Sequence, residues 1–258
     1  MKKIIKLFLS FILLISLASC SLFSSSTSYD DSNATVVEVS TTISEVVKKV
    51  ESGCVCVYSQ SSINASASIG SGVIFKKVDS TYYVLSNYHC VEDFVSVSDA
   101  KFYIYAGTNM QKYEASLTNY YNSQKDLAVL TFESNVDLTV ISISTDYSPI
   151  VTAGETVIAI GCPISLNYYN TVTTGVVSKE EYSISNNGGS EKIIQHSAPI
   201  NPGNSGGALF NLAGELIGIN FKKSTYTTDG SEKVVVDAIN FAIALSEVQT
   251  FLSGQKLI

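Results

Sequence analysis

A glycine-rich turn around one serine constrains this chain more than any other feature. The turn, Asn201–Gly207 (NPGNSGG), lies between short apolar runs at residues 192–195 and 208–210. Glycine reaches backbone dihedrals that other residues avoid, so the turn can expose Ser205 and aim backbone N–H groups at one point. A serine becomes a useful nucleophile when a base takes its proton and N–H groups hold the oxyanion. Gly203 and Ser205 are the candidate oxyanion donors. An ordinary hairpin turn has the same composition. The turn is therefore interpreted as a catalytic one only if a matching base exists elsewhere in the chain.

The search for a base is short because the chain has only two histidines. His89 follows residues 82–86, a β-branched and aromatic run that predicts a strand, and it is the candidate base. His196 lies in the predicted strand leading into the serine turn, where a packing or surface role is expected. A histidine base needs an acceptor that fixes its tautomer. Asp126, at the start of the apolar run 127–130, is the best candidate; without the other two residues it would be interpreted as a solvated turn carboxylate.

The chain order His89, Asp126, Ser205 is that of the chymotrypsin-type triad. The sequence around these residues resembles the HtrA (Deg) family of trypsin-like serine proteases, from about residue 45 to 253. Five ordered segments carry the resemblance: Gly70–Phe75, Ser86–Val91, Asp126–Leu130, Val157–Pro163 and Gln195–Asn220. The resemblance implies that Ser205 is the nucleophile, His89 the general base and Asp126 the residue that orients it. It implies no cofactor and no metal.

Many short strands separated by turn residues predict an antiparallel sandwich or barrel. Strands are expected at Cys54–Tyr58, Val73–Lys76, Tyr82–Ser86, Phe102–Tyr105, Leu127–Phe132, Thr156–Ile160, Thr171–Ser178, Ile193–Gln195, Leu216–Asn220 and Val234–Ile239, and helices at Thr42–Val50 and Leu245–Ser253. The resemblance selects an all-β fold of two antiparallel six-stranded β-barrels with a C-terminal helix. The protease domain is expected at residues 42–258, with the barrels at about 52–148 and 149–245.

The resemblance also locates a specificity pocket, at Pro199, Ile219, Asn220 and Asn240. Pro199 lies where this fold lines the base of the pocket, and it carries no charge. Asn240 stands where relatives often have glycine, which narrows the pocket. Small or medium apolar residues, rather than Lys or Arg, are therefore expected before the scissile bond. Relatives often add PDZ modules after the protease domain, whereas this chain ends at Ile258, which suggests a form without one.

The N-terminus has the pattern of an export signal. A basic start precedes the apolar run Leu7–Leu17, which is short for a membrane span. Leu17–Cys20 (LASC) resembles the lipobox of bacterial lipoproteins, which implies cleavage after residue 19 and a lipid on Cys20. Residues 20–41, rich in Ser and Thr, are expected to be a flexible tether. These features predict an extracytoplasmic protein anchored to a bacterial membrane.

Four further cysteines permit disulfides in an exported protein: Cys54, Cys56, Cys90 and Cys162. They allow three full pairings, between which the sequence does not choose. We favour the interpretation that the four cysteines are unpaired and act as small buried hydrophobic side chains. A zinc site is not expected, because no CxxC spacing is present.

The charge of the chain argues against nucleic acid as a partner. The net charge is −7, no arginine is present, and the lysines are scattered. The expected partners are polypeptide substrates, unfolded ones among them, and the resemblance allows a homotrimer.

Two function classes follow from these features. The first is a serine endopeptidase, for which the resemblance allows a role in quality control of extracytoplasmic proteins. The second is a catalytically silent surface lipoprotein that binds through the same fold. A glutamate-selective protease of the same fold is the third interpretation. It would require Gly-Ser in place of Gly206-Gly207 and a pocket histidine at a different position from His196.

Overall fold

The computed structural model describes residues 41–63, 66–186, 189–223, 226–229, 232–235 and 237–258. The predicted signal peptide, the lipobox with Cys20 and nearly all of the predicted tether lie outside the described residues. Within the described part of the chain, neither α-helix is long and apolar enough to cross a bilayer.

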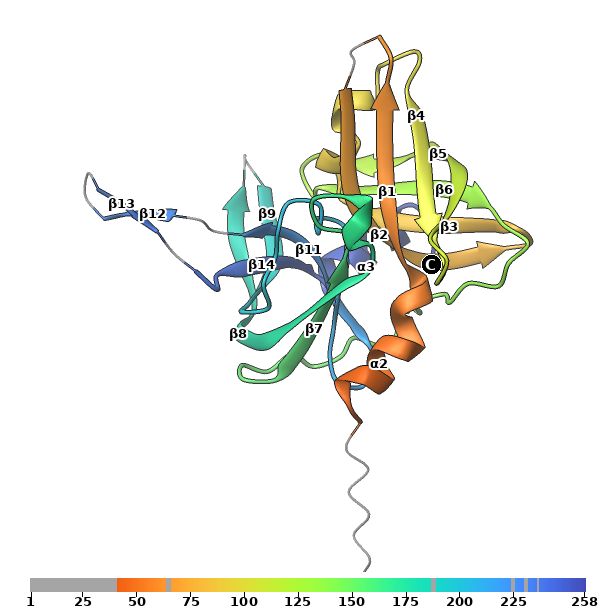
Figure 1. The fold of residues 1–258 in the computed structure, drawn as a ribbon. Coiled ribbons are helices and arrows are strands. Elements are labelled where there is room, and N and C mark those ends of the chain that lie inside the picture. Colours follow the sequence, from red (N-terminus) through yellow and green to blue (C-terminus); the bar gives the residue numbers. More distant parts are fainter. Residues whose placement is uncertain (1–40, 64–65, 187–188, 224–225, 230–231, 236) are drawn as a thin grey trace, which may run out of the picture. The chain divides into compact units, whose positions relative to one another are not determined.

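Two closed antiparallel barrels of six strands each make up the fold (Figure 1). The N-terminal barrel has the strand order β1-β2-β3-β6-β5-β4 and the C-terminal barrel the order β10-β11-β14-β9-β8-β7. The N-terminal barrel contains β1 (Cys54–Ser61), β2 (Ser66–Val78), β3 (Thr81–Ser86), β4 (Lys101–Ala106), β5 (Gln111–Asn122) and β6 (Leu127–Glu133). The C-terminal barrel contains β7 (Thr156–Gly161), β8 (Thr171–Asn186), β9 (Gly189–His196), β10 (Ala208–Phe210), β11 (Leu216–Lys223) and β14 (Asn240–Ala244). The all-β two-barrel prediction is confirmed.

Helices and a small sheet complete the described elements. The α-helices are α2 (Ile43–Val50) and α3 (Leu245–Gly254), and the 3-10 helices are η1 (Glu51–Gly53), η2 (Tyr88–Cys90), η3 (Glu92–Phe94) and η4 (Leu166–Tyr168). Strands β12 (Tyr226–Asp229) and β13 (Glu232–Val235) pair with each other. Helix α2 begins where Thr42 and Glu45 form a capping box, which satisfies backbone N–H groups that a helix start leaves open.

One predicted strand is wrong. The sequence predicts a single strand over Val234–Ile239, but β13 ends at Val235 and β14 begins only at Asn240. Ala238 lies between them with φ +56°, a left-handed conformation that cannot continue a strand. A turn therefore overrides the β-branched composition of the run.

Alternation along the strands divides the core into three parts. In β1, Val55 and Val57 pack inside the N-terminal barrel, whereas Cys54 packs in a separate cluster. In β7, Val157 lies inside the C-terminal barrel, whereas Ile158 belongs to the same cluster as Cys54. Because successive side chains of a strand point to opposite faces, this shared cluster is the apolar layer between the barrels. That layer holds the two barrels in a fixed docking.

Candidate active site

The three predicted catalytic residues come from both barrels. The pairing of β3 with β6 places Ser86 opposite Ala128, so the end of β3 and the start of β6 lie together. His89, in η2, follows β3, and Asp126 comes just before β6. Ser205 lies in the loop between β9 and β10 of the C-terminal barrel. The site therefore depends on how the barrels dock.

His89 and Asp126 make two hydrogen bonds. His89 Nδ1 lies 2.7 Å from Asp126 Oδ2, and the backbone N–H of His89 donates to Oδ1 over 2.9 Å. Asp126 adopts φ +49°, a left-handed conformation that aspartate tolerates better than most residues. Its backbone carbonyl accepts hydrogen bonds from Tyr88 N–H and the Asn87 side chain, which hold this turn in place. The carboxylate is thus fixed at the Nδ1 side of the imidazole, which leaves Nε2 for proton transfer.

The surroundings of His89 raise its affinity for a proton. Burial on its own lowers the pKa of His89, because it disfavours the charged imidazolium. The hydrogen bond to Asp126 and the contact with the Cys90 thiol act in the opposite direction and raise the pKa to about 10. This arrangement favours the imidazolium that a general base becomes when it accepts a proton.

The serine turn uses glycine at two left-handed positions. Gly203 has φ +96° and follows Pro202, and Asn204 N–H donates to Asn201 O over 3.0 Å. Proline then glycine at the central positions is typical of a type II turn. Gly206 has φ +84°, and a Cβ there would lie 2.1 Å from the backbone oxygen of Ser71. The N-terminal barrel therefore approaches this turn so closely that no side chain fits at Gly206.

The backbone N–H groups of Gly203 and Ser205 donate none of the hydrogen bonds formed among the described residues. Both are thus available to an oxyanion. The Ser205 hydroxyl donates to Phe221 O over 3.3 Å, and within the described residues it has no hydrogen bond to His89. Catalytic hydrogen bonds often form fully only when substrate binds. The Cys90 thiol, next to His89, reaches Ser205 O at 3.6 Å, which places the serine turn beside the His–Asp pair.

The predicted specificity residues occupy different environments. Pro199 is exposed, whereas Ile219 is fully buried in the layer between the barrels. Asn220 is buried, and its side-chain amide donates to Ala208 O over 2.8 Å. Asn240 is buried beside His196, whose carbonyl it contacts at 3.5 Å. His196 is not a surface residue: it is completely buried, and burial lowers its pKa to about 4.

Three residues that were not among the predicted site residues contact the serine turn or its neighbours. Ser71 hydrogen-bonds to the serine turn from the N-terminal barrel, Cys90 contacts both His89 and Ser205, and Ile164 donates a backbone hydrogen bond to Pro202 O. The Gly-Ser-Gly motif at 70–72 was the available signal for Ser71, since small residues mark a close backbone approach. Cys54, Cys56, Cys90 and Cys162 are all free and buried.

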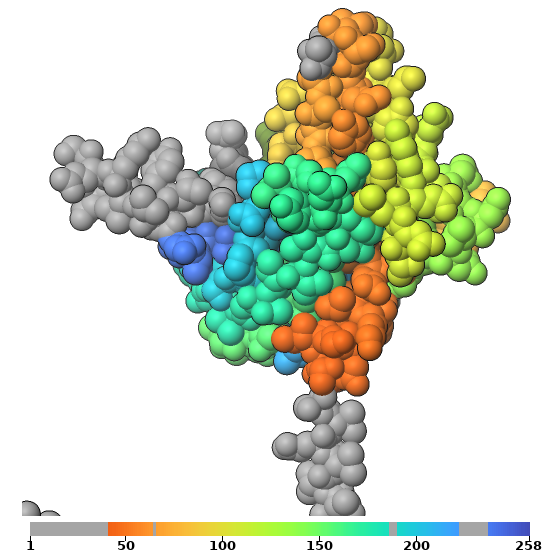
Figure 2. Space-filling model, in the orientation of Figure 1, coloured from red at the N-terminus to blue at the C-terminus, as the bar shows by residue number. Residues whose placement is uncertain are grey.

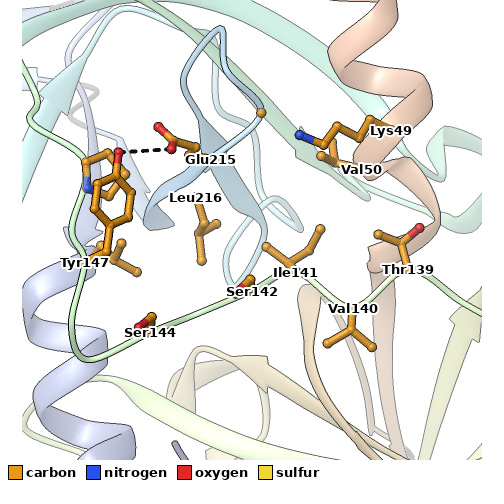
Figure 3. A pocket seen from close by; sticks show the side chains of 13 residues that line it. Lys49, Val50, Thr139, Val140, Ile141, Ser142, Ser144, Tyr147, Glu215 and Leu216 are labelled. Carbon is orange, nitrogen blue, oxygen red and sulfur yellow. Dashed lines mark hydrogen bonds between the residues drawn. The ribbon is translucent and has the colours of Figure 1, made fainter.

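A well-formed hollow lies elsewhere, among α2, the segment between the barrels and the start of β11 (Figure 3). Its wall includes Lys49, Ile141 and Leu216, and the hydroxyl of Tyr147 donates to Glu215 across its rim over 3.0 Å. None of the candidate catalytic residues lines it, so the chemistry of the serine turn is not located there.

Two six-stranded antiparallel barrels, with a His–Asp pair on one and a glycine-rich serine turn on the other, define the class of trypsin-like folds. The chain belongs to the family of trypsin-like peptidase domains, whose model matches residues 70–219. The predicted resemblance to the HtrA family is confirmed by relatives of this chain that are named HtrA and DegP-like proteases.

The chain is 36% identical over 194 residues to "Serine protease Do-like HtrA" of Lactobacillus helveticus, covering 71% of this chain and 42% of that protein. It is 34% identical to "Probable periplasmic serine endoprotease DegP-like" of Pseudomonas fluorescens, covering 74% of this chain and 36% of the relative. The crystal structure of the serine endoprotease from Yersinia pestis matches with a TM-score of 0.62 and 32% identity, covering 85% of this chain and 68% of that one. The chain spans about half the length of the curated relatives it matches.

Proposed function

We propose that this protein is a serine endopeptidase that uses Ser205, His89 and Asp126 as a catalytic triad. The observation that carries the proposal is the paired hydrogen bonding of His89 to Asp126, beside a turn whose two N–H groups are available. A fold kept only for binding would not need a fixed His–Asp pair next to an open oxyanion site. The alternative, a catalytically silent lipoprotein, is therefore not favoured.

The proposed reaction proceeds in two halves. His89 takes the proton of the Ser205 hydroxyl as Oγ attacks the peptide carbonyl, and the N–H groups of Gly203 and Ser205 stabilise the oxyanion. Asp126 keeps the imidazole oriented and stabilises its positive charge. His89 then gives the proton to the departing amine, which leaves an acyl-enzyme on Ser205. Water, activated by the same histidine, releases the acid product.

The expected substrates follow from the pocket residues. Pro199, Ile219, Asn220 and Asn240 provide no fixed charge, so selection for Lys or Arg is not expected. We propose that small or medium apolar residues precede the cleaved bond. Such residues become accessible in unfolded polypeptides, which fits a role in protein quality control.

The proposed location is outside the cytoplasm, at a bacterial membrane. The export signal and the lipobox pattern at Leu17–Cys20 support cleavage after residue 19 and attachment through lipid on Cys20. We propose residues 20–41 as the tether and 42–258 as the protease domain, with the division between the barrels near residues 148–149. The family resemblance suggests that the protein assembles as a homotrimer. The net charge of −7 argues against nucleic acid as a binding partner.

A fluorophosphonate probe tests the proposal directly, because it reacts with activated serines. The purified chain and its Ser205→Ala variant are treated with the probe, and their intact masses are compared. One adduct on the wild type and none on the variant is the expected result. No adduct on the wild type, even with unfolded substrate added, would favour the binding lipoprotein. In cells, Cys20→Ser should release the protein from membranes; retention would contradict the lipobox interpretation.

A further inference from the structure

A buried ion pair joins the C-terminal helix to the loop that carries Asp126. The ammonium group of Lys125, the residue before Asp126, contacts the carboxylate of Glu247 in the first turn of α3. The side chain of Glu247 is 9% exposed, and glutamate is rarely buried to this degree unless it is paired. A helix start favours negative charge, which keeps this carboxylate ionised. The pair therefore links the C-terminal part of the chain to the proposed triad.

Helix α3 has a fixed place between the barrels. Its residues Val248 and Leu252 lie in the apolar layer that joins them. Beyond the helix, the carbonyl of Leu257 accepts a hydrogen bond of 2.8 Å from the Lys76 ammonium group in β2. On the face that Figure 2 shows, the orange strands β1 and β2 lie against β7 and the green segment that follows it, so the barrels are in direct contact there as well. Glu247 is therefore held at a defined position relative to the N-terminal barrel.

The backbone of the loop that carries Lys125 and Asp126 is fixed as well. The N–H group of Lys125 donates to the Asn122 side chain over 3.0 Å, and the carboxylate of Asp126 accepts its two hydrogen bonds from His89. The Lys125 side chain is not fixed in this way, because a lysine ammonium group sits on a flexible four-carbon stem. Without Glu247, this ammonium group would have the carboxylate of the next residue in the chain as a nearby partner.

A cation bound to Asp126 would harm the proposed site in two ways. It would compete with His89 for the carboxylate oxygens, and its charge would disfavour the imidazolium that forms during the reaction. In the structure the groups that raise the pKa of His89 are Asp126 and the Cys90 thiol, and Lys125 is not among the groups that change it. An apolar residue in place of Glu247 would dock α3 without the cost of burying a charge. The benefit of this carboxylate therefore lies in where it holds the ammonium group.

We infer that Glu247 is a positioning residue for the proposed triad, and that it acts by holding the ammonium group of Lys125 away from the carboxylate of Asp126. The inference rests on the proposed peptidase function. It makes the orientation of His89 depend on the place of α3, a helix that contributes no group to the chemistry itself. A purely structural ion pair would behave differently, because loss of either partner would then lower stability and activity together.

The test compares Glu247→Gln, which frees the ammonium group, with Lys125→Met, which removes it, and with the double variant. The substrate is fluorescein-labelled casein, an unfolded polypeptide. Glu247→Gln should lower the maximal kcat about tenfold, a small part of the roughly 10⁴-fold lost when a triad acid is replaced, with KM little changed. The freed charge should also move the ascending limb of kcat/KM to lower pH, by about half a unit or more. Lys125→Met and the double variant should keep the kcat and the pH profile of the wild type.

Melting temperatures separate this role from a structural one. Lys125→Met leaves a buried carboxylate without a partner, so it should lower the melting temperature most although it keeps kcat. The control is Asp137→Asn, which frees the ammonium group of Lys77 at the end of β6 opposite to Asp126 and should change neither kcat nor the pH profile. If Glu247→Gln does not fold, Glu247→Met frees the same ammonium group with a side chain that adapts to apolar surroundings.

Two results would overturn the role of Glu247. One is a kcat of Lys125→Met as low as that of Glu247→Gln, and the other is a double variant that does not recover. Fluorophosphonate labelling separates these results from failure of the enzyme. The wild type should label on Ser205, and Glu247→Gln more slowly; equal rates in all variants would also reject the role of Glu247. A wild type that is not labelled, even with casein present, would instead reject the peptidase function.

Discussion

The side-chain hydroxyl of Ser71, in the N-terminal barrel, donates a hydrogen bond of 2.7 Å to the carbonyl of Gly203 in the C-terminal barrel. The backbone N–H of Ser71 also donates to Ser205 O over 2.7 Å, and Cys162 N–H donates to the Ser71 hydroxyl over 2.8 Å. Ser71 thereby holds the carbonyls of the two residues whose N–H groups form the proposed oxyanion site. A buried hydroxyl from one barrel fixes the orientation of a turn in the other.

Replacement of Ser71 with alanine should therefore impair catalysis more than binding. Loss of one oxyanion donor costs about 10²–10³ in kcat, so loss of its support should cost about tenfold to a hundredfold, with KM little changed. The matched control is Ser86→Ala, which removes another fully buried hydroxyl, one that donates to Ser71 O over 2.7 Å but does not contact Gly203. Steady-state kinetics and melting temperatures of both variants check this prediction. Equal losses of kcat in the two variants would contradict a specific role for Ser71.

Activity should increase as the pH rises through the alkaline range. The pKa of His89 is raised to about 10, and only the neutral imidazole can accept the proton of Ser205. Because the Cys90 thiol contributes to that rise, Cys90→Ala should shift the ascending limb of kcat/KM to lower pH. Cys54→Ala, which removes a buried thiol that contacts Val50 O instead, should leave the profile unchanged. A profile of Cys90→Ala that coincides with the wild type would contradict this assignment.

The folded protein should lose stability in mild acid because of His196. Burial lowers its pKa to about 4, whereas an unfolded histidine titrates near 6.5. Between these values the unfolded chain binds more protons, so the free energy of unfolding falls as the pH drops from about 6.5 towards 4. A shift of this size corresponds to a loss on the order of 3 kcal/mol. Denaturant unfolding at pH 7 and pH 4.5 should show a smaller pH dependence in His196→Gln; the same dependence in both proteins would count against His196 as the cause.

Gly206 should tolerate alanine far less well than Gly154, a glycine with a similar positive φ. A Cβ at Gly206 would meet Ser71 O at 2.1 Å and Ser86 Oγ at 2.5 Å, and φ is +84°. Gly154 has φ +91°, but a Cβ there would have no atom within 4 Å, so Gly154→Ala isolates the backbone cost of about 1–2 kcal/mol. Gly206→Ala should cost about 1–3 kcal/mol more through overpacking, as measured by chemical denaturation. Similar costs for the two variants would mean that the barrels separate easily at this point.

The strand pattern predicted an antiparallel sandwich or barrel, and the family resemblance selected the two-barrel fold. His89, Asp126 and Ser205 could be proposed because each lies in a short local motif. Ser71 was not recognised as a support of the turn, since its partners Gly203 and Ser205 lie more than 130 residues away and meet it only when the barrels dock. The ion pair of Lys125 with Glu247 was equally hidden, because its two residues lie more than 120 residues apart and meet only when α3 docks on the N-terminal barrel.

Strand β5 (Gln111–Asn122) was missed for a different reason. Tyr113, Ala115 and Leu117 alternate with polar residues and pack against the core of the N-terminal barrel, which is the pattern of a half-buried strand. The alternation covers only the first half of the strand, because the second half is largely polar or exposed and shifts register against β6. Hydrogen bonding to β4 and β6 on either side fixes the whole strand in the barrel.

Because the proposed site is divided between two barrels, it is complete only when the barrels are docked. His89, Asp126 and Ser71 belong to one barrel and the serine turn to the other, so neither half alone holds a complete set of groups. Under the proposed mechanism, the chain becomes able to hydrolyse peptides only when its two barrels have docked. By the same reasoning, a copy whose barrels separate would lose that activity.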